Sequence, residues 1–533
     1  MHFSLSSAVV SICLASSIPQ CLSLWHFRKH FLGTGALAMS STILRRYRNL
    51  STAAFVVGRS YCSTTGRSSL FSRISPLGDP SISLVPVLDD WVQQGNTVNP
   101  FDLHRVVKDL RSRRRFTQAL QVSEWMSSKG VYPFSAGDRA VQLDLIGKVR
   151  GLEIAESYFQ NLSENDKTNK LHGALLNCYV REGLVDKSLS LLQKIKDMGF
   201  ASALNYNSIM CLYTQTDQLE KVPDVMKLMK EDGVSPDIFS YRICINSYGA
   251  RSDLVNMEKL LDEMESQSHI VTDWDTYSMV ANFYIKAGLK EKALISLEKC
   301  EDKADKRNVL AYNYLISQYA SLGNKKTMMR LWEHQKANCK KQLNREYIIM
   351  LSCLVKVGEF DQAEKVLEEW QLSGNCYDFR VPNTLLIGYS QRGLIEKAET
   401  LLQSIVEKGK TPIPNSWSII ASGYVAEENM EKAFQCMKNA VAVVDQNKGW
   451  KPKPNIISSI LSWAANNKDL DEVEDLINLL RTVIPMNRNM YLYLIKAYVR
   501  CGKEVDGILE SMKADNIGVD EEIEKILSSG SQQ

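Results

Sequence analysis

Four basic residues stand at matching places along this chain and could bind phosphate groups. Arg181, Lys286, Lys356 and Arg500 each occupy the thirteenth place of a recurring segment, near the end of a predicted helix. Basic side chains neutralise the phosphates of nucleic acids, and binding of this kind weakens as salt increases. A cation near a helix C-terminus also interacts favourably with the helix dipole and needs no ligand. Two interpretations follow, a phosphate-binding stripe or helix-terminal charges.

A second group of basic residues lies within one predicted turn. Arg111, Arg113, Arg114 and Arg115 form the densest positive cluster after the N-terminal segment. The turn could contact a phosphate backbone, with Arg113, Arg114 and Arg115 as the candidate residues. It could instead be a solvated turn that keeps this end of the molecule soluble.

Residue patterns typical of enzymes and metal sites do not occur in the sequence. The twelve cysteines are scattered without a Cys-x-x-Cys pair, and neither a GxxxxGK[ST] nor a Gly-x-Ser-x-Gly motif is present. Three of the seven histidines (His2, His26 and His30) lie in the N-terminal segment, which leaves few for acid–base or metal chemistry. We therefore expect no catalytic activity, metal, cofactor or small-molecule substrate.

The candidate residues are carried by a sequence that repeats itself. Successive units begin 35, 36, 35, 35 and 35 residues apart, at Ala203, Ile238, Trp274, Val309, Asn344 and Phe379. Within residues 203–237, apolar residues spaced by three or four predict two helices, and Gly233 and Pro236 end the second one. Each unit is therefore predicted to be a helical hairpin that buries its apolar stripe against neighbouring units.

The repeat pattern covers residues 100–520. Its first unit is 100–134, less regular units follow at 135–168 and 169–202, and the regular series ends at Ile413. The last three units are 414–453, which is 40 residues long, 454–487 and 488–520. We expect an all-α solenoid of about twelve hairpins, with a linker and possible capping helix at 79–99 and a C-terminal tail at 521–533.

The N-terminal segment, residues 1–78, has the composition of an organellar transit peptide with a short connector. It contains eight basic residues and no Asp or Glu, whereas the remaining chain has 56 basic and 61 acidic residues. A secretory signal fits less well, because the basic residues follow the apolar run instead of preceding it. No later apolar run reaches the roughly 18 residues that a membrane-spanning helix needs, so no membrane association is expected.

The joins between units resemble those of the pentatricopeptide repeat (PPR) family. Gly233-Val234-Ser235-Pro236-Asp237, Lys410-Thr411-Pro412 and Lys453-Pro454-Asn455 place a proline at the join. A period of 35, without the Trp-Leu-Gly-Tyr pattern, differs from tetratricopeptide repeats. The stretch RRRFTQALQVSEWM is similar to short plant mitochondrial members, and no His-x-Glu or Cys-x-x-Cys deaminase signature follows the array. The resemblance implies a right-handed α-solenoid without an editing domain.

The resemblance also has a consequence for the N-terminus. The sequence Arg-Ser-Tyr-Cys-Ser at 59–63 is similar to a plant mitochondrial processing site, with cleavage near Tyr61. Import into the mitochondrion is favoured over import into the chloroplast. Translation could start at Met1 or at Met39.

In this family a base is read by the fifth residue of a repeat together with its last residue. Asn207 with Asp237 is similar to the uracil-preferring pair, while Ser278 with Asn308 and Ser458 with Asn487 are similar to the adenine-preferring pair. Asn313 and Asn383 supply an amide at the fifth place, but the last residues of their units depart from the code. Asn, Ser and Asp are also common helix caps, whether or not a base is present.

The resemblance implies binding to organellar RNA, in support of RNA processing, stability or translation, by occupancy and partner recruitment. One alternative is a structural subunit of the mitochondrial ribosome or another ribonucleoprotein, in contact with ribosomal RNA and proteins. The other is a protein-binding scaffold. The expected partners are therefore single-stranded or ribosomal RNA and, in the second case, ribonucleoprotein proteins.

Overall fold

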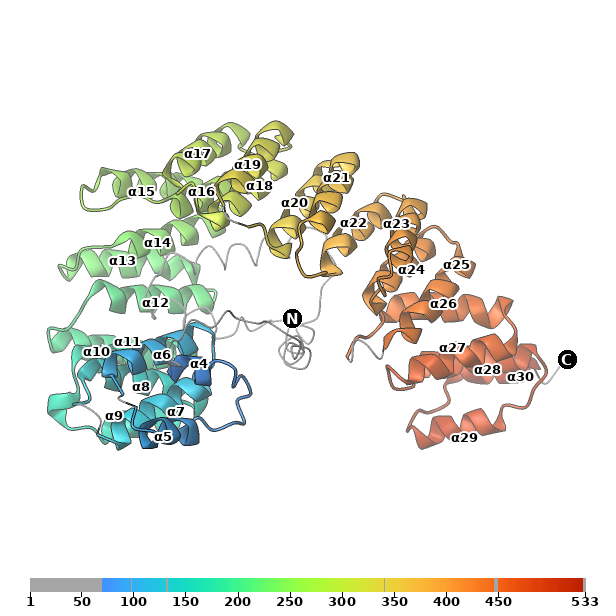
Figure 1. Ribbon diagram of the computed structural model, residues 1–533, viewed down its shortest axis with the longest axis horizontal. Helices are drawn as coiled ribbons and strands as arrows, with labels where there is room; N and C mark the ends of the chain where they lie inside the picture. Colours follow the sequence, from blue (N-terminus) through green and yellow to red (C-terminus); the bar gives the residue numbers. More distant parts are fainter. Residues whose placement is uncertain (1–69, 97, 131–132, 340, 445–448, 531–533) are drawn as a thin grey trace. The chain divides into compact units, whose positions relative to one another are not determined.

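The computed structural model describes residues 70–96, 98–130, 133–339, 341–444 and 449–530. Every regular element within these ranges is a helix (Figure 1). The chain divides into two compact units, residues up to Ala304 and residues from Asp305 onward. The predicted processing site near Tyr61 lies outside the described residues.

From Leu70 onward, where the first unit is described, it contains fourteen α-helices and two short 3-10 helices, η1 (Glu164–Asp166) and η2 (Leu219–Lys221). The α-helices are α4 (Leu70–Ile74), α5 (Val85–Gln93), α6 (Pro100–Ser112), α7 (Phe116–Ser128), α8 (Ala136–Val149), α9 (Leu152–Gln160), α10 (Asn169–Arg181), α11 (Val185–Asp197), α12 (Ala203–Gln215), α13 (Val222–Glu231), α14 (Ile238–Ala250), α15 (Leu254–Ser266), α16 (Trp274–Lys286) and α17 (Lys290–Lys303).

The second unit is built in the same way. Its helices are α18 (Val309–Ser321), α19 (Lys325–Asn338), α20 (Asn344–Val357), α21 (Phe360–Leu372), α22 (Arg380–Gln391), α23 (Ile395–Glu407), α24 (Pro414–Ala426), α25 (Met430–Ala442), α26 (Pro454–Asn467), α27 (Leu470–Arg481), α28 (Arg488–Arg500), α29 (Asp506–Ala514) and α30 (Glu521–Gly530).

The helices from α6 to α29 pair into twelve hairpins, which confirms the predicted all-α repeat architecture. Helices α12, α14, α16, α18 and α20 begin at the predicted unit starts, and α22 begins one residue after Phe379. The local signals explain this agreement. Asp237 caps α14 by accepting a hydrogen bond from the Ser240 backbone N–H, and Gly233 takes the positive φ that follows the end of α13.

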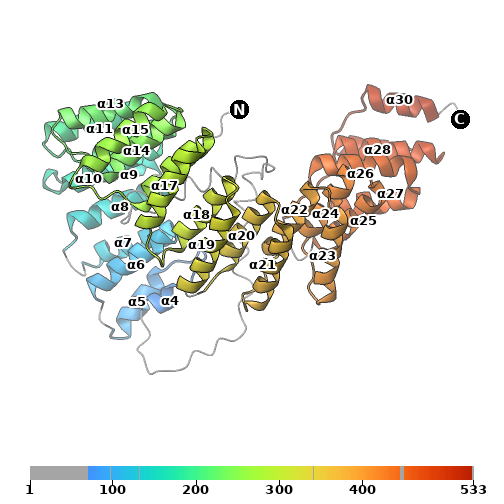
Figure 2. The ribbon, with the colours of Figure 1, turned by 90° about the horizontal axis from the view of Figure 1, so that it is seen from above.

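Successive first helices pack directly on one another within each unit. In the first unit α8, α10, α12, α14 and α16 form such a series, and in the second unit α24, α26 and α28 lie side by side (Figure 2). Between α14 and α16 the backbones approach closely, since a Cβ on Gly249 would lie 2.3 Å from the ring of Phe283. Only glycine allows the two helices to approach this far.

In several repeats a tyrosine of the first helix donates its hydroxyl hydrogen bond to a carboxylate on or just after a neighbouring second helix. Tyr241 donates its hydroxyl hydrogen bond to Glu263 at 2.7 Å, and the Lys230 ammonium contacts the same carboxylate at 2.6 Å. The same arrangement recurs in Tyr206 with Asp232 and Lys196, Tyr284 with Glu258 and Lys292, Tyr347 with Glu369 and Lys336, and Tyr424 with Glu399 and Lys432. A buried ring with a bonded hydroxyl stabilises each join.

An additional segment covers the first hairpin. Helix α5 packs on α7, its Leu88 side chain is buried, and Trp125 of α7 donates a hydrogen bond to Asp89 at 2.9 Å. This helix lies within the linker where a capping helix was considered possible.

The other end of the chain requires a correction. Residues 521–530, expected to form part of a tail, are the helix α30, which packs on α28 and buries Ile523. Within the described residues, no helix is both long enough and apolar enough to cross a membrane.

Candidate functional site

The fifth-place residue Asn207 lies on α12, where it is held between two repeats. Its side chain is 7% exposed. The amide Nδ2 donates to Asp237 at 3.0 Å, and the amide oxygen accepts a hydrogen bond from the Ser240 hydroxyl at 2.7 Å. The structure therefore brings the predicted pair Asn207 and Asp237 together. It also shows that both residues bond to the start of the next first helix, α14.

The next repeat has Arg242 at the fifth place, and this side chain is only 1% exposed. Its guanidinium donates to Asp275, which is 2% exposed, and lies 3.5 Å from Asp273, the N-cap of α16. This buried arginine joins α14 to α16 through Asp275 of the following repeat, and it forms an ion pair with Asp273, the last residue of its own repeat. If Arg242 or Asp275 were removed, the remaining charge would be buried without a partner, and this would destabilise the protein.

In the second unit, Asn313 of α18 belongs to a buried polar network. Its oxygen accepts from Gln335 at 3.0 Å, and its Nδ2 lies 3.4 Å from the Glu346 carboxylate of α20. Asn383 of α22 accepts a hydrogen bond at 2.8 Å from the Ser416 hydroxyl of α24. Both fifth-place amides therefore bond to the third-place residue of the following repeat.

The polar fifth-place residues between Asn207 and Ser418 share one property. Each has less than a tenth of its surface exposed: Asn207, Arg242, Ser278, Asn313, Asn383 and Ser418. The Ser278 hydroxyl donates to the Asp275 carbonyl at 3.2 Å within its own helix. Its predicted partner Asn308 belongs to the second unit, where it caps α18 through the Leu310 and Ala311 N–H groups. Base contact by these residues stays a prediction.

The repeat that begins at Pro454 is different. Ser458 is half-buried, and its hydroxyl accepts a long hydrogen bond of 3.4 Å from Asn489. Asn487 is exposed and caps α28 by accepting from the backbone N–H groups of Asn489 and Met490. The pair thus flanks an accessible surface, although Ser458 is contacted by Asn489 instead of by Asn487.

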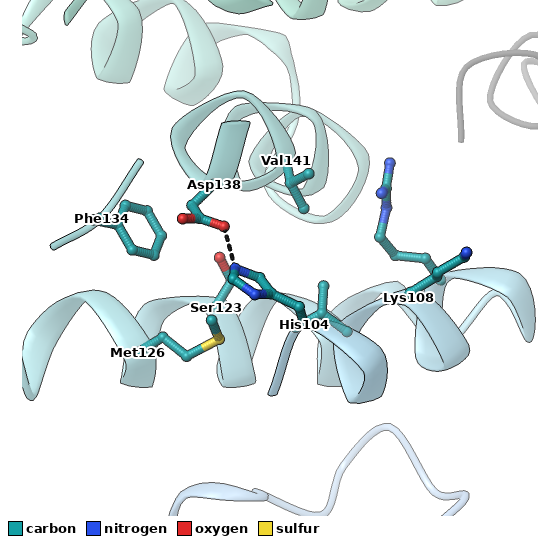
Figure 3. A pocket seen from close by; sticks show the side chains of 9 residues that line it. His104, Lys108, Ser123, Met126, Phe134, Asp138 and Val141 are labelled. Atoms are coloured by element: carbon teal, nitrogen blue, oxygen red, sulfur yellow. Dashed lines mark hydrogen bonds and ion pairs between the residues drawn. The ribbon is translucent and has the colours of Figure 1, made fainter. Parts of the chain in front are cut away.

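The first repeat is open as well, and it carries a pocket. His104 stands at the fifth place of α6, and its side chain is 46% exposed. Its Nε2 lies 2.6 Å from Asp138 of α8, and the two side chains meet across the space between their helices (Figure 3). A pocket of about 200 Å³ surrounds this pair and is lined by His104, Val107, Lys108, Arg111, Ser123, Met126, Phe134, Asp138 and Val141.

Asp138 is held rigidly by the start of α8. It forms a capping box with Ser135, since each side chain accepts a hydrogen bond from the backbone N–H of the other residue. Burial raises the pKa of Asp138, but hydrogen bonds from Ser135 and His104 outweigh burial and hold the pKa below its usual value. The carboxylate is therefore charged at neutral pH and presents an acceptor to His104.

The arginine turn after α6 is only partly accessible. Arg113 and Arg114 are exposed, and the Arg113 guanidinium also lies 5.4 Å from the centre of the Phe71 ring. Arg115 is half-buried and donates a hydrogen bond to the Ser75 carbonyl at 2.8 Å. Arg115 therefore holds the N-terminal segment, and only Arg113 and Arg114 remain accessible for a phosphate.

The thirteenth-place cations also divide into two groups. Arg181 has 6% of its side chain exposed and lies 3.4 Å from Asp144 and 3.5 Å from Glu182, which speaks against a phosphate contact at this residue. Lys286, Lys356 and Arg500 are exposed at the ends of their helices. Lys356 donates to the Ser321 hydroxyl at 2.9 Å, and Arg500 donates to the Lys468 carbonyl.

No metal centre is evident in the part of the chain that the structure describes, where no group of three or more His, Cys, Asp or Glu side chains could hold an ion. The thiols of two buried cysteines are also uncharged. Burial raises the pKa of Cys244 to about 12 and that of Cys353 to about 11, so both thiols are protonated at neutral pH.

The sequence analysis missed His104, Lys108 and Asp138 as site residues. One signal for His104 was present. It is the fifth residue of the unit that begins at Pro100, just as Asn207 is the fifth residue of the unit that begins at Ala203. The pocket itself has no such signal. It exists because α6 and α8 are not in close backbone contact, unlike α8 with α10 or α10 with α12.

Comparison with known proteins adds the family context. The PPR repeat matches at residues 172–200, 239–269, 347–375 and 381–409, and a second description, PPR repeat family, matches at 201–250. A mitochondrial pentatricopeptide repeat-containing protein of Arabidopsis thaliana is 46% identical over 473 residues, which cover 88% of this chain and 96% of the relative.

Two further proteins extend this picture. The large ribosomal subunit protein mL101 of Arabidopsis thaliana is 32% identical over 87% of this chain and 95% of its own length. The crystal structure of PPR10 from maize has a TM-score of 0.43 and 19% identity, over 86% of this chain and 70% of that one. Repeat matches within both units, together with the near full-length relatives, establish that the chain belongs to the pentatricopeptide repeat family.

Proposed function

We propose that this protein binds RNA in the mitochondrion and supports RNA processing, stability or translation by occupying its target. The observation that carries the proposal is the open, basic first repeat. Residues 100–134 contain seven basic and three acidic residues, although the chain from residue 79 onward is acidic overall. An RNA strand is attracted to such a local excess of positive charge.

The proposed contacts combine two kinds of residue. Lys286, Lys356 and Arg500, together with Arg113 and Arg114, supply cations for phosphates, and the exposed fifth-place residues supply hydrogen bonds to bases. No step of this function requires the chain to catalyse a reaction, and no cofactor enters it. Three relatives, including the 46%-identical one, are named as mitochondrial proteins, in agreement with the predicted location.

RNA binding can be tested with the purified full chain and a pool of single-stranded oligonucleotides at several salt concentrations. Binding constants are obtained from retention on a filter. We expect the logarithm of the binding constant to fall linearly with the logarithm of the salt concentration, with a slope of about 0.7 for each phosphate contact. Retention that does not depend on salt, or no retention at low salt, would reject the proposal.

A structural role in the mitochondrial ribosome is the second candidate, and the similarity to mL101 over 95% of that ribosomal protein favours it. Sedimentation of the tagged protein from mitochondria separates the two roles. Migration with large ribosomal particles, lost when these particles dissociate, supports the ribosomal role. A small particle crosslinked to one transcript supports the first proposal.

A further inference from the structure

Three basic side chains from the first three hairpins meet a single carboxylate. Asp144 of α8 lies 3.1 Å from the Arg111 guanidinium of α6 and 2.5 Å from the Lys148 ammonium of its own helix. It also lies 3.4 Å from the Arg181 guanidinium of α10. The side chains of Lys148 and Arg181 are only 5% and 6% exposed, and those of Arg111 and Asp144 are mostly buried. These four residues form the Asp144 cluster.

The charges of the Asp144 cluster do not balance, since three cations and one carboxylate leave a net charge of +2. Glu182 lies 3.5 Å from Arg181, but its side chain is 46% exposed, so water screens much of its charge. Cys178, which also lies near Arg181, stays a neutral thiol because burial raises its pKa. Buried charges are tolerated in proteins when they are paired. The cluster therefore has too few anions for its cations.

Two further observations indicate the same deficit. Within the described part of the chain, the Nε–H of Arg111 and one terminal NH₂ group of Arg181 are buried without a hydrogen-bond acceptor. Buried donors of this kind are rare and costly. Burial and the charges of Arg111 and Arg181 lower the pKa of Lys148, although Asp144 opposes this shift. A bound anion accepts hydrogen bonds from such donors and favours the charged form of Lys148.

The structure provides access to the cluster beside Arg111. The pocket of about 200 Å³ is lined by Arg111 and by the exposed Lys108, both of α6 (Figure 3). On the other side, Gly147 of α8 leaves room for Arg181, since a Cβ on Gly147 would lie 2.6 Å from the Arg181 guanidinium. The burial of Arg181 opposes contact with a phosphate inside an RNA strand, which brings its neighbouring nucleotides with it. A free or terminal phosphate group has no such restriction.

We propose that the Asp144 cluster binds one doubly charged phosphate group, either the inorganic ion or the terminal phosphate of a nucleotide chain. Arg111, Lys148 and Arg181 contact the phosphate, and Asp144 positions these three cations. Guanidinium groups match the geometry of phosphate oxygens. A terminal phosphate carries a charge of about −1.5 to −2 at pH 7, against −1 for a phosphate inside a strand, and so offsets the net charge of the cluster. This inference does not depend on the proposed RNA binding.

The bound phosphate joins α6, α8 and α10, so the stability of the protein should depend on phosphate concentration. Thermal unfolding of the full chain is measured while sodium phosphate replaces sodium chloride at pH 7 and constant ionic strength, and titration calorimetry gives the stoichiometry. We expect one phosphate per chain and a melting temperature that rises further with each increase in phosphate above the dissociation constant. Absence of measurable phosphate binding, or equally tight binding of nitrate, which carries one charge, overturns the inference.

Variants locate the site. Arg111→Gln and Lys148→Met should each weaken phosphate binding by roughly 10- to 150-fold, the range for the loss of one hydrogen bond to a charged group. The matched controls Arg113→Gln and Lys292→Met remove exposed cations outside the cluster and should bind phosphate as the unchanged protein does. The controls also correct for the general stabilisation of proteins by phosphate. Full retention of phosphate binding in Arg111→Gln and Lys148→Met contradicts the inference.

The melting temperature of Lys148→Met separates a phosphate site from a purely structural ion pair. Without phosphate, removal of one excess charge should leave the melting temperature unchanged or raise it. In saturating phosphate, the variant should melt below the unchanged protein. A structural ion pair predicts a lower melting temperature in both conditions. Arg111→Gln, at the most exposed of the three cations, keeps the binding test decisive where Lys148→Met does not fold.

A competition experiment assigns the source of the phosphate. A short RNA oligonucleotide with a 5′-phosphate, or the same oligonucleotide without it, is added to the protein with inorganic phosphate bound. Displacement only by the phosphorylated oligonucleotide assigns the site to a chain end, and displacement by neither assigns it to the inorganic ion. Equal displacement by both shows that a phosphate inside the strand is sufficient, and it rejects the inference while it supports RNA binding.

Discussion

His104 and Asn207 occupy the same place in their repeats, yet their surroundings differ. His104 lies on α6, which is not in close contact with α8, and its side chain is 46% exposed beside a pocket. Asn207 lies on α12, which packs directly on α14, and its side chain bonds to Asp237 and Ser240. The same place in a repeat is thus filled by the next repeat at Asn207 and partly open to solvent at His104.

The comparison teaches that one place in a repeat can serve two purposes in the same chain. A polar residue there has to be hydrogen-bonded when it is buried, and for Asn207, Asn313 and Asn383 the third-place residue of the next repeat supplies a partner. His104, at the same place, is partly exposed instead.

Replacing Arg242 with Met should lower the stability of the protein more than any other change considered. The change leaves the Asp275 carboxylate buried without its partner, and we expect the free energy of unfolding to fall by about 3–5 kcal/mol. Urea denaturation followed by circular dichroism measures this loss. Lys292→Met, which removes an exposed ion pair to Glu258, is the matched control and should cost about 1 kcal/mol or less. Similar losses in both variants would contradict the fastening role of Arg242.

Gly249→Ala tests the close approach of α14 to α16. The new Cβ would collide with the Phe283 ring, so we expect a loss of about 1–3 kcal/mol from strain between α14 and α16. Gly507→Ala in α29 meets nothing within 4 Å and should be neutral or stabilising by up to about 1 kcal/mol. A neutral Gly249→Ala would show that α14 and α16 can separate without cost.

Asn313→Ala and His104→Ala compare a buried with a partly exposed residue at the fifth place of a repeat. Removal of the Asn313 amide leaves Gln335 and Glu346 without a buried partner and should cost about 1–3 kcal/mol. The accessible His104 should change stability by no more than about 0.5 kcal/mol. Equal melting temperatures for the two variants would remove the distinction between closed and open repeats.

The hydrogen bonds between tyrosines and carboxylates should make stability depend on pH in the alkaline range. Burial and the Glu399 carboxylate raise the pKa of Tyr424 to about 12, and burial and Asp515 raise that of Tyr491 to about 12. Because the unfolded chain loses these protons first, stability should be complete below pH 10 and should fall between about pH 10 and 12. A pH titration of the melting temperature measures the fall, and a flat profile in this range would contradict the assignment.

The exposed cations should affect salt dependence and leave stability nearly unchanged. Replacing Lys286, Lys356 and Arg500 with Gln should lower the slope of RNA binding against salt by about 2 units, if each meets one phosphate. The control replaces Lys230, Lys292 and Lys432, which pair with carboxylates on second helices, and should leave the slope unchanged. An equal change in both sets would show that no phosphate stripe exists.

Much of the fold was predictable because helix starts depend on local residues. The residue before a helix supplies the cap, as Asp237 does for α14, and the apolar spacing supplies the buried face. Helix α30 was missed although its residues Ile523 and Leu527 have helical spacing, because a stretch of this length at a chain end gives a weak signal.

The site was less predictable, since it depends on contacts across repeats. The burial of Asn207 requires Ser240, 33 residues away, and the position of Arg115 depends on the Ser75 carbonyl, 40 residues before it. No periodicity within one repeat encodes such partners. The sequence identified the places where polar residues recur, but it did not show which of these residues the fold buries.

The segment from Leu70 to Gln93 has a consequence for assembly. It covers α7 with Leu88 and Trp91, and Arg115 secures it through Ser75. Without it, the first hairpin would present a bare apolar surface of the kind that hairpins use to stack. The segment therefore covers the apolar surface at this end of the array, and we expect a chain shortened to begin after Gln93 to expose that surface and to aggregate more readily than the full chain.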